Sequence, residues 1–209
     1  MKKALIVTLL FPLLLMLNGC LTTLHPIFTE KELVVGNQLT GNWKNVQDGK
    51  ISTYRKASKD DLKQFSETLQ QSNDRVYIAI IYNGTDEPPS KYYAFLVQLG
   101  NHFYLDYYPA DTKERAATSA FFKAHYIPMH GVYRVDFNPD GSFQLKQLDA
   151  GFLEKLIKNK QIRLQYEELN DGGYFITAST SELQQYLIKY SDTPEAYGNN
   201  NPQLFSKTN

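Results

Sequence analysis

The stretch from Lys91 to Pro109, "KYYAFLVQLGNHFYLDYYP", constrains the fold of this chain most strongly. Two runs of aromatic and aliphatic residues flank Gly100-Asn101, a dipeptide suited to a tight turn with positive φ. Pro109 cannot donate to a strand ladder and ends the second run. The stretch therefore predicts a β-hairpin with two long strands.

Weaker signals of the same kind lie on both sides of this hairpin. Apolar and polar residues alternate along further segments, and turn residues separate these segments in pairs. One run, "RVYIAIIYNG", is apolar without interruption, which predicts a strand that is covered on both faces. The other predicted hairpins span residues 39–57 with a turn at Asp48-Gly49, 131–149 with a turn at 138–141, and 161–180 with a turn at 170–173.

Three segments have the 3.6-residue apolar spacing of helices instead. We expect these helices at about 59–70, 149–160 and 180–190. Ser58 with Asp61, and Ser179 with Glu182, resemble capping boxes, and Asp149 is a suitable N-cap. The helices interrupt the hairpins and do not alternate regularly with single strands.

Together these elements predict a mainly β (α+β) fold. Consecutive hairpins with short turns favour a strongly bent antiparallel sheet or barrel of about eight to nine strands, covered by about three helices. An aromatic content of 13% is enough to build one sizeable core. We expect a single domain over residues 39–190 and a poorly ordered tail over 191–209.

The first twenty residues form a separate unit. Two lysines precede an apolar run from Ala4 to Leu17, which is shorter than the roughly 20 residues of a membrane-spanning helix. Its length and flanks are typical of a secretory signal. Leu17, Gly19 and Cys20 resemble the lipobox of bacterial lipoproteins, although Asn18 replaces the usual small residue.

The lipobox resemblance implies that residues 1–19 are removed after Gly19 and that Cys20 carries acyl chains. Residues 20–38 would then form a lipidated tether. Two or more acyl chains hold a protein stably on a membrane. The alternative is an ordinary secretory signal in which Cys20, the only cysteine of the chain, is incidental.

The residue after Cys20 and the net charge of the chain indicate where the protein is located and which classes of partner it is expected to bind. Leu21, and not aspartate, follows Cys20, which by analogy with other lipoproteins favours the outer membrane facing the periplasm. The chain has 22 basic and 22 acidic residues; without Lys2 and Lys3 these become 20 and 22, a net charge of −2. This balance argues against a nucleic-acid partner and against a polybasic lipid-binding patch.

Gly41-Asn42-Trp43 resembles the first conserved element of lipocalins, a G-x-W near the start of the barrel. The resemblance implies a cavity for a small apolar ligand, with Trp43 packed across the closed end. Tyr92, Tyr104 and Tyr107 are further candidates for lining such a pocket, since tyrosine combines an apolar ring with a polar tip. Alternatively, all four residues simply fill the core.

The remaining motifs give little support for catalysis. His25, His102, His125 and His130 have no metal-ligand spacing, and a site would need Asp106 or Asp136 as a further ligand. We find no cofactor motif and no nucleophile elbow. We therefore expect a non-catalytic envelope lipoprotein that binds a small apolar ligand. The alternative is a structural or accessory protein that contacts a protein or cell-wall partner through its surface.

Overall fold

The computed structural model describes residues 21–84, 87–110, 126–169, 173–197 and 202–208. The predicted signal segment 1–19, its cleavage site at Gly19 and the predicted lipidation site Cys20 lie outside the described residues, as does His125. No helix among the described residues is both long enough and apolar enough to cross a membrane.

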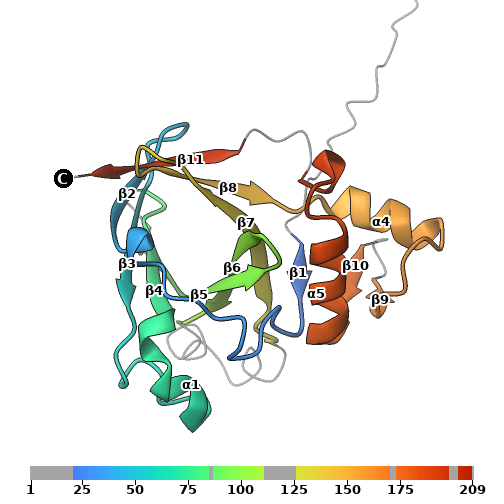
Figure 1. The fold of residues 1–209 in the computed structure, drawn as a ribbon, viewed down its shortest axis with the longest axis horizontal. Coiled ribbons are helices and arrows are strands. Elements are labelled where there is room, and N and C mark those ends of the chain that lie inside the picture. Colours follow the sequence, from blue (N-terminus) through green and yellow to red (C-terminus); the bar gives the residue numbers. More distant parts are fainter. Residues whose placement is uncertain (1–20, 85–86, 111–125, 170–172, 198–201, 209) are drawn as a thin grey trace, which may run out of the picture.

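Eight antiparallel strands close into a barrel (Figure 1). Each strand from β2 to β7 pairs with the next one along the chain, and β11 then joins β8 to β2. The predicted barrel is therefore confirmed. The barrel strands are β2 (Gly41–Asn45), β3 (Ile51–Lys56), β4 (Val76–Ile81), β5 (Ser90–Leu99), β6 (His102–Pro109), β7 (His130–Phe137), β8 (Phe143–Gln147) and β11 (Gln203–Thr208).

Turn chemistry sets the register of the two best predicted hairpins. Gly100 has φ 59° between β5 and β6, and Gly141 has φ 85° between β7 and β8. Both values lie in the left-handed region that glycine adopts without strain. The chain reverses at these two positions as the sequence predicted, and Leu99 pairs with His102.

The end of the chain does not form a poorly ordered tail, and that prediction is wrong for most of residues 191–209. Residues Pro194–Tyr197 form a 3₁₀ turn, η3, and Gln203–Thr208 form β11. Phe205 of β11 pairs with Phe143 on one side and Asn45 on the other. Without β11, both β2 and β8 would have an edge of unpaired backbone N–H and C=O groups. Hydrogen bonds to these groups hold β11 in the barrel.

The start of the described chain is also part of the fold, so the prediction of a tether over 20–38 is wrong from Leu21 onward. Leu21 and Ile27 are buried. Between them, β1 (Thr22–Thr23) pairs antiparallel with β7 and parallel with β10 (Tyr174–Ile176). β10 pairs in turn with β9 (Tyr166–Glu168), so β1, β10 and β9 extend the sheet outside the barrel.

Among the described residues, three helices pack outside the barrel wall (Figure 1). Asp149 caps α4 (Ala150–Lys158), and Ser179 with Glu182 forms the predicted capping box of α5 (Thr180–Lys189). The helix predicted over 59–70 is only α1 (Glu67–Gln71), followed by a 3₁₀ turn, η2 (Asn73–Arg75). It starts late because Ser66 is its N-cap, whereas Asp61 binds Ser58 and Arg55 within a separate turn.

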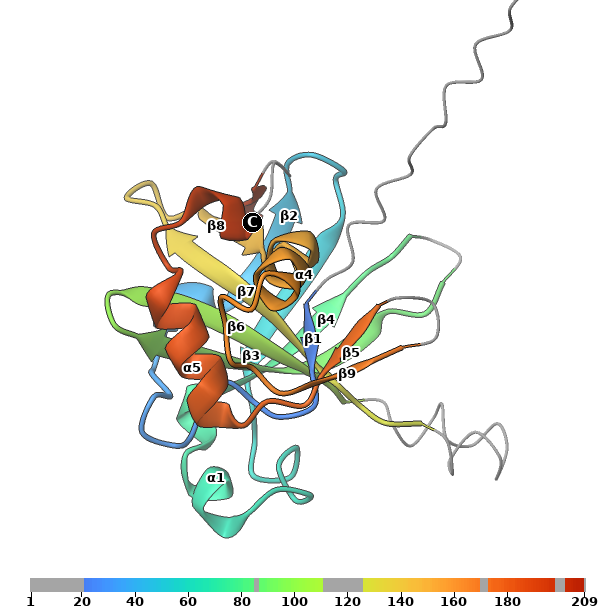
Figure 2. The same cartoon turned by 90° about the vertical axis from the view of Figure 1, so that its right-hand side faces the viewer.

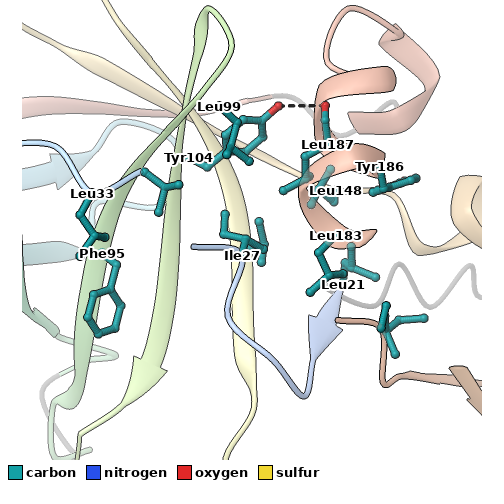
Figure 3. Close-up of a cluster of buried hydrophobic side chains, with 14 of the residues drawn as sticks. Leu21, Ile27, Leu33, Phe95, Leu99, Tyr104, Leu148, Leu183, Tyr186 and Leu187 are labelled. Atoms are coloured by element: carbon teal, nitrogen blue, oxygen red, sulfur yellow. Dashed lines mark hydrogen bonds between the residues drawn. The ribbon is translucent and has the colours of Figure 1, made fainter. Parts of the chain in front are cut away.

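Because strand side chains alternate, the barrel wall separates two apolar clusters. One fills the barrel interior, and the other lies between the wall and the outer helices. Figure 3 shows the outer cluster, in which Tyr104 donates a hydrogen bond across to the carbonyl of Leu187 on α5, at 3.3 Å. Because the outer cluster covers the wall on this side, an opening into the barrel interior is expected at one of the two barrel ends.

Candidate functional site

A cavity of about 410 Å³ opens at one end of the barrel. This end, here called the mouth, is where β2, β4 and β6 finish and where β3, β5 and β7 begin. The cavity is within the range of 300–1,000 Å³ that is typical of small-ligand sites. Its walls include Thr22, Asn45, Ser52, Tyr54, Ile81, Tyr92, Tyr107, Gly131, Tyr133, Leu145 and Phe205.

Aromatic rings form the floor of this cavity. The Tyr54 and Tyr107 hydroxyl groups are 2.7 Å apart and hydrogen-bonded. The Tyr107 ring also makes edge contacts with Tyr92 and Tyr133, with ring centroids 6.0 and 5.6 Å away. Burial raises the pKa of Tyr54 to about 12 and that of Tyr107 well above its usual value. The floor is therefore uncharged at neutral pH.

Polar groups are concentrated nearer the opening. Asn45 and Ser52 are buried on β2 and β3, and they line the cavity together with Asp48 and Lys50 of the connecting turn. Lys50 Nζ lies 3.4 Å from Asp48 Oδ2, so these two charges offset each other. The cavity thus combines an apolar, aromatic floor with a polar and nearly neutral rim.

The opposite end of the barrel is closed. The 3₁₀ turn η1 (Asn37–Leu39) lies against it, and Leu39 is fully buried. A Cβ atom at Gly36 would lie 2.2 Å from Leu96 Cδ2, so any larger residue here would require the buried Leu96 side chain to move. The Gly36 N–H donates to the Tyr77 hydroxyl at 2.7 Å, which fixes the chain to the interior.

The four aromatic residues predicted to contact ligand are placed in three environments. Tyr92 and Tyr107 line the mouth cavity. Trp43 packs edge-on against Phe143, with centroids 4.7 Å apart, and its Nε1–H donates to the Leu39 carbonyl at 2.7 Å. Tyr104 points outward to α5. Trp43 and Tyr104 therefore belong to the two cores and are not part of this candidate site.

Sequence reasoning did not select Tyr54, Gly131 or Tyr133, which share the cavity. Tyr54 and Tyr133 lie in the hairpins predicted over 39–57 and 131–149, where alternation predicts strands but no cavity. Only the closure of the barrel shows that these inward faces meet Tyr92 and Tyr107. Gly131 carries no side-chain signal, because its contribution is the space it leaves.

A buried acid–histidine pair lies on the outer side of the same wall. His130 Nδ1 is 2.6 Å from Asp106 Oδ1, and the Ile27 N–H donates to Asp106 Oδ2 at 3.0 Å. The Tyr108 ring packs on the imidazole. Within the described ranges, no three His, Cys, Asp or Glu side chains come together as a metal site would require. The pair fixes the N-terminal segment to the barrel.

Comparison with known proteins identified no relatives that could assign this site: no family model, no curated protein and no solved structure matches the chain.

Proposed function

We propose that this protein is a lipoprotein of the bacterial cell envelope, held on the membrane through Cys20, that binds one small amphipathic ligand in the mouth of its barrel. The mouth cavity is the observation that supports ligand binding most directly. The lipobox-like sequence at Leu17 to Cys20 supports the anchor. Envelope location, with the outer membrane favoured by Leu21, follows from the same resemblance.

The chemistry of the cavity favours an uncharged ligand body with a polar end. Tyr54, Tyr92, Tyr107 and Tyr133 offer apolar ring surface deep in the cavity. Desolvating a charge there would be costly, because the described floor has no ionised group to pair with it. Near the opening, the amide of Asn45 and the hydroxyl of Ser52 are suited to hydrogen bonding with a polar group.

Ligand binding is tested by filling the cavity at Gly131. This glycine does not require a positive φ, and a Cβ atom there would meet only Tyr133 Cε2, at 3.9 Å. Gly131→Leu therefore preserves the strand while occupying the site. The leucine side chain would prevent a few ligand carbons from being buried, which costs about 1.5–3 kcal/mol of binding free energy. We therefore expect the fluorescent ligand N-phenylnaphthylamine to bind about 10- to 100-fold more weakly.

Two further variants control this measurement. Lys44→Leu adds the same side chain at an exposed position on β2 and should leave the affinity unchanged. Gly131→Ala should have an intermediate effect, because its methyl group enters the cavity only slightly. Equal affinity in Gly131→Leu and the unmodified protein, with both folded by circular dichroism, would exclude the mouth as the binding site.

The anchor is tested independently by the mass of the N-terminal peptide from membrane fractions. We expect a chain that begins at Cys20 with added acyl groups, and we expect Cys20→Ala to be released from the membrane. An unmodified Cys20 in the mature protein would refute the lipoprotein assignment but leave ligand binding unaffected.

A further inference from the structure

We infer that the mouth of the barrel rests directly on the membrane surface, so that ligand passes between the bilayer and the cavity without crossing water. This inference rests on the proposed acylation of Cys20. It adds an orientation and a partner surface, the lipid bilayer, to the proposed function. The position of β1 and the apolar residues around the mouth support it independently.

The anchor point is joined to the mouth by only two peptide steps. Thr22 lines the cavity and pairs with Gly131 of β7, which lines it as well. Thr23 is fully buried, and the Leu24 N–H donates to the Ile176 carbonyl at 2.9 Å. The chain is therefore fixed in the sheet from Thr22 onward and provides no flexible tether.

Covalent geometry then limits the height of the mouth above the membrane. Two extended residues span at most about 7 Å, which limits how far from Thr22 an anchor at position 20 can reach. Each headgroup layer of a bilayer is about 5–7 Å thick. Acyl chains on Cys20 consequently bring the part of the mouth next to β1 to the headgroup layer.

Large apolar side chains are exposed around this opening. Val46 follows Asn45 at the end of β2, Tyr82 follows Ile81 at the end of β4, and Ile127 precedes Met129 at the start of β7. Their exposed fractions are 55%, 42% and 59%. Each of them thus lies one or two residues from the wall of the cavity.

The β9–β10 hairpin adds apolar residues next to the N-terminal strand, because β10 pairs with β1. Leu169 and Tyr166 on this hairpin are 47% and 39% exposed. Figure 2 shows the β4–β5 and β9–β10 hairpins projecting to the same side of the barrel.

The chemistry of this surface favours lipid as its partner. Exposed aliphatic and tyrosine side chains suit the boundary between headgroups and acyl chains. Lys50, on the wall of the mouth, is paired with Asp48. We therefore expect the exposed apolar side chains, and not Lys50, to make the main contact with lipid. An amphipathic ligand could enter with its apolar part first, toward the tyrosine floor.

Depth measurement on the full acylated protein tests the orientation. Because Cys20 is acylated, a second cysteine can be labelled selectively with a nitrobenzoxadiazole fluorophore, at Val46→Cys, Tyr82→Cys or, as the control at the closed end, Gln98→Cys. Protein reconstituted in phosphatidylcholine vesicles should lose fluorescence at positions 46 and 82, but not at 98, when the lipids carry nitroxide groups on their acyl chains.

A matched pair of charge substitutions tests ligand entry. Ile127→Glu adds a carboxylate at the mouth, and Ile188→Glu adds one on α5, where Ile188 is 51% exposed. Transfer of N-phenylnaphthylamine from vesicles to the protein should slow in Ile127→Glu alone. Equilibrium affinity measured without vesicles should be unchanged in both variants.

The possible failures can be told apart. If Cys20 is acylated but all three labels are equally inaccessible to the nitroxides, the orientation is wrong while the lipoprotein assignment stands. Shielding of positions 46 and 82 without vesicles would show a protein partner or a second copy at the mouth and would also overturn the inference. If mass spectrometry finds Cys20 unmodified, the anchor and the orientation fail together, while the Gly131 series still decides ligand binding.

Discussion

Replacing Asp106 with alanine should be among the most destabilising single changes in this protein. The carboxylate is fully buried and accepts hydrogen bonds from two groups, His130 Nδ1 at 2.6 Å and the Ile27 N–H at 3.0 Å. Alanine would leave both donors buried and unpaired. Each buried donor left without a partner costs about 1–3 kcal/mol, so the two together cost about 2–6 kcal/mol.

We therefore expect Asp106→Ala to lower the free energy of unfolding by about 2–6 kcal/mol, a large part of the roughly 5–15 kcal/mol typical of a folded domain. Urea denaturation followed by the fluorescence of Trp43 measures this change, because the indole is buried in the barrel interior. Hydrogen exchange should also rise between Leu21 and Leu33, since Asp106 holds this segment through Ile27.

Asp60→Ala is the matched control. Asp60 pairs with Lys63 at 2.9 Å, but both side chains are at least 75% exposed, so its loss should cost about 0–1 kcal/mol. Asp106→Ala with a loss as small as that of Asp60→Ala would refute the view that the Asp106 pair holds the N-terminal segment on the barrel. Unchanged exchange in residues 21–33 would do so as well.

Two further predictions concern barrel closure and pH. Phe205→Ala should lower the free energy of unfolding measured in urea by about 3–5 kcal/mol, because the ring is buried and stacked on Phe143 with centroids 4.9 Å apart. Ser206→Ala should change it by no more than about 0.5 kcal/mol, and equal effects of the two variants would contradict the closing role of β11. The hydrogen bonds of Asp61 with Arg55 lower the pKa of this carboxyl. The contribution of Asp61 to the free energy of unfolding is therefore fully present above the unfolded pKa of about 4 and is lost as the pH falls from there through the lower folded pKa. The difference in unfolding free energy between the unmodified protein and Asp61→Asn should consequently narrow in acid and not in base.

Local signals in the sequence predicted the parts of the fold that depend on neighbouring residues. The glycines at 100 and 141 and the caps at Asp149 and Ser179 act within a few residues, and all four are found as expected. The interval between Ser58 and Ser66 shows the limit of such reasoning. Both serines form caps, but only the second one is followed by a helix.

The missed strands depend on pairing between distant parts of the chain. Thr22–Thr23 is too short to show alternation, and Gln203–Thr208 has a single buried aromatic residue, Phe205. Their backbone partners lie on β7, β10, β2 and β8, far away in sequence. The cavity was only partly predictable for the same reason, because Tyr54 and Tyr107 become neighbours through closure alone.

The place of β11 along the chain has a consequence for how this protein is made. Seven barrel strands precede it, so until Gln203–Thr208 have been synthesised the sheet has two open edges, on β2 and β8. Chains emerge N-terminus first, and unpaired edges are prone to aggregation. A prematurely terminated product would therefore be an open sheet and not a slightly shorter barrel. Closure by β11 makes synthesis through Thr208 a condition for the closed barrel, and copies that stop before it would expose these strand edges to proteases.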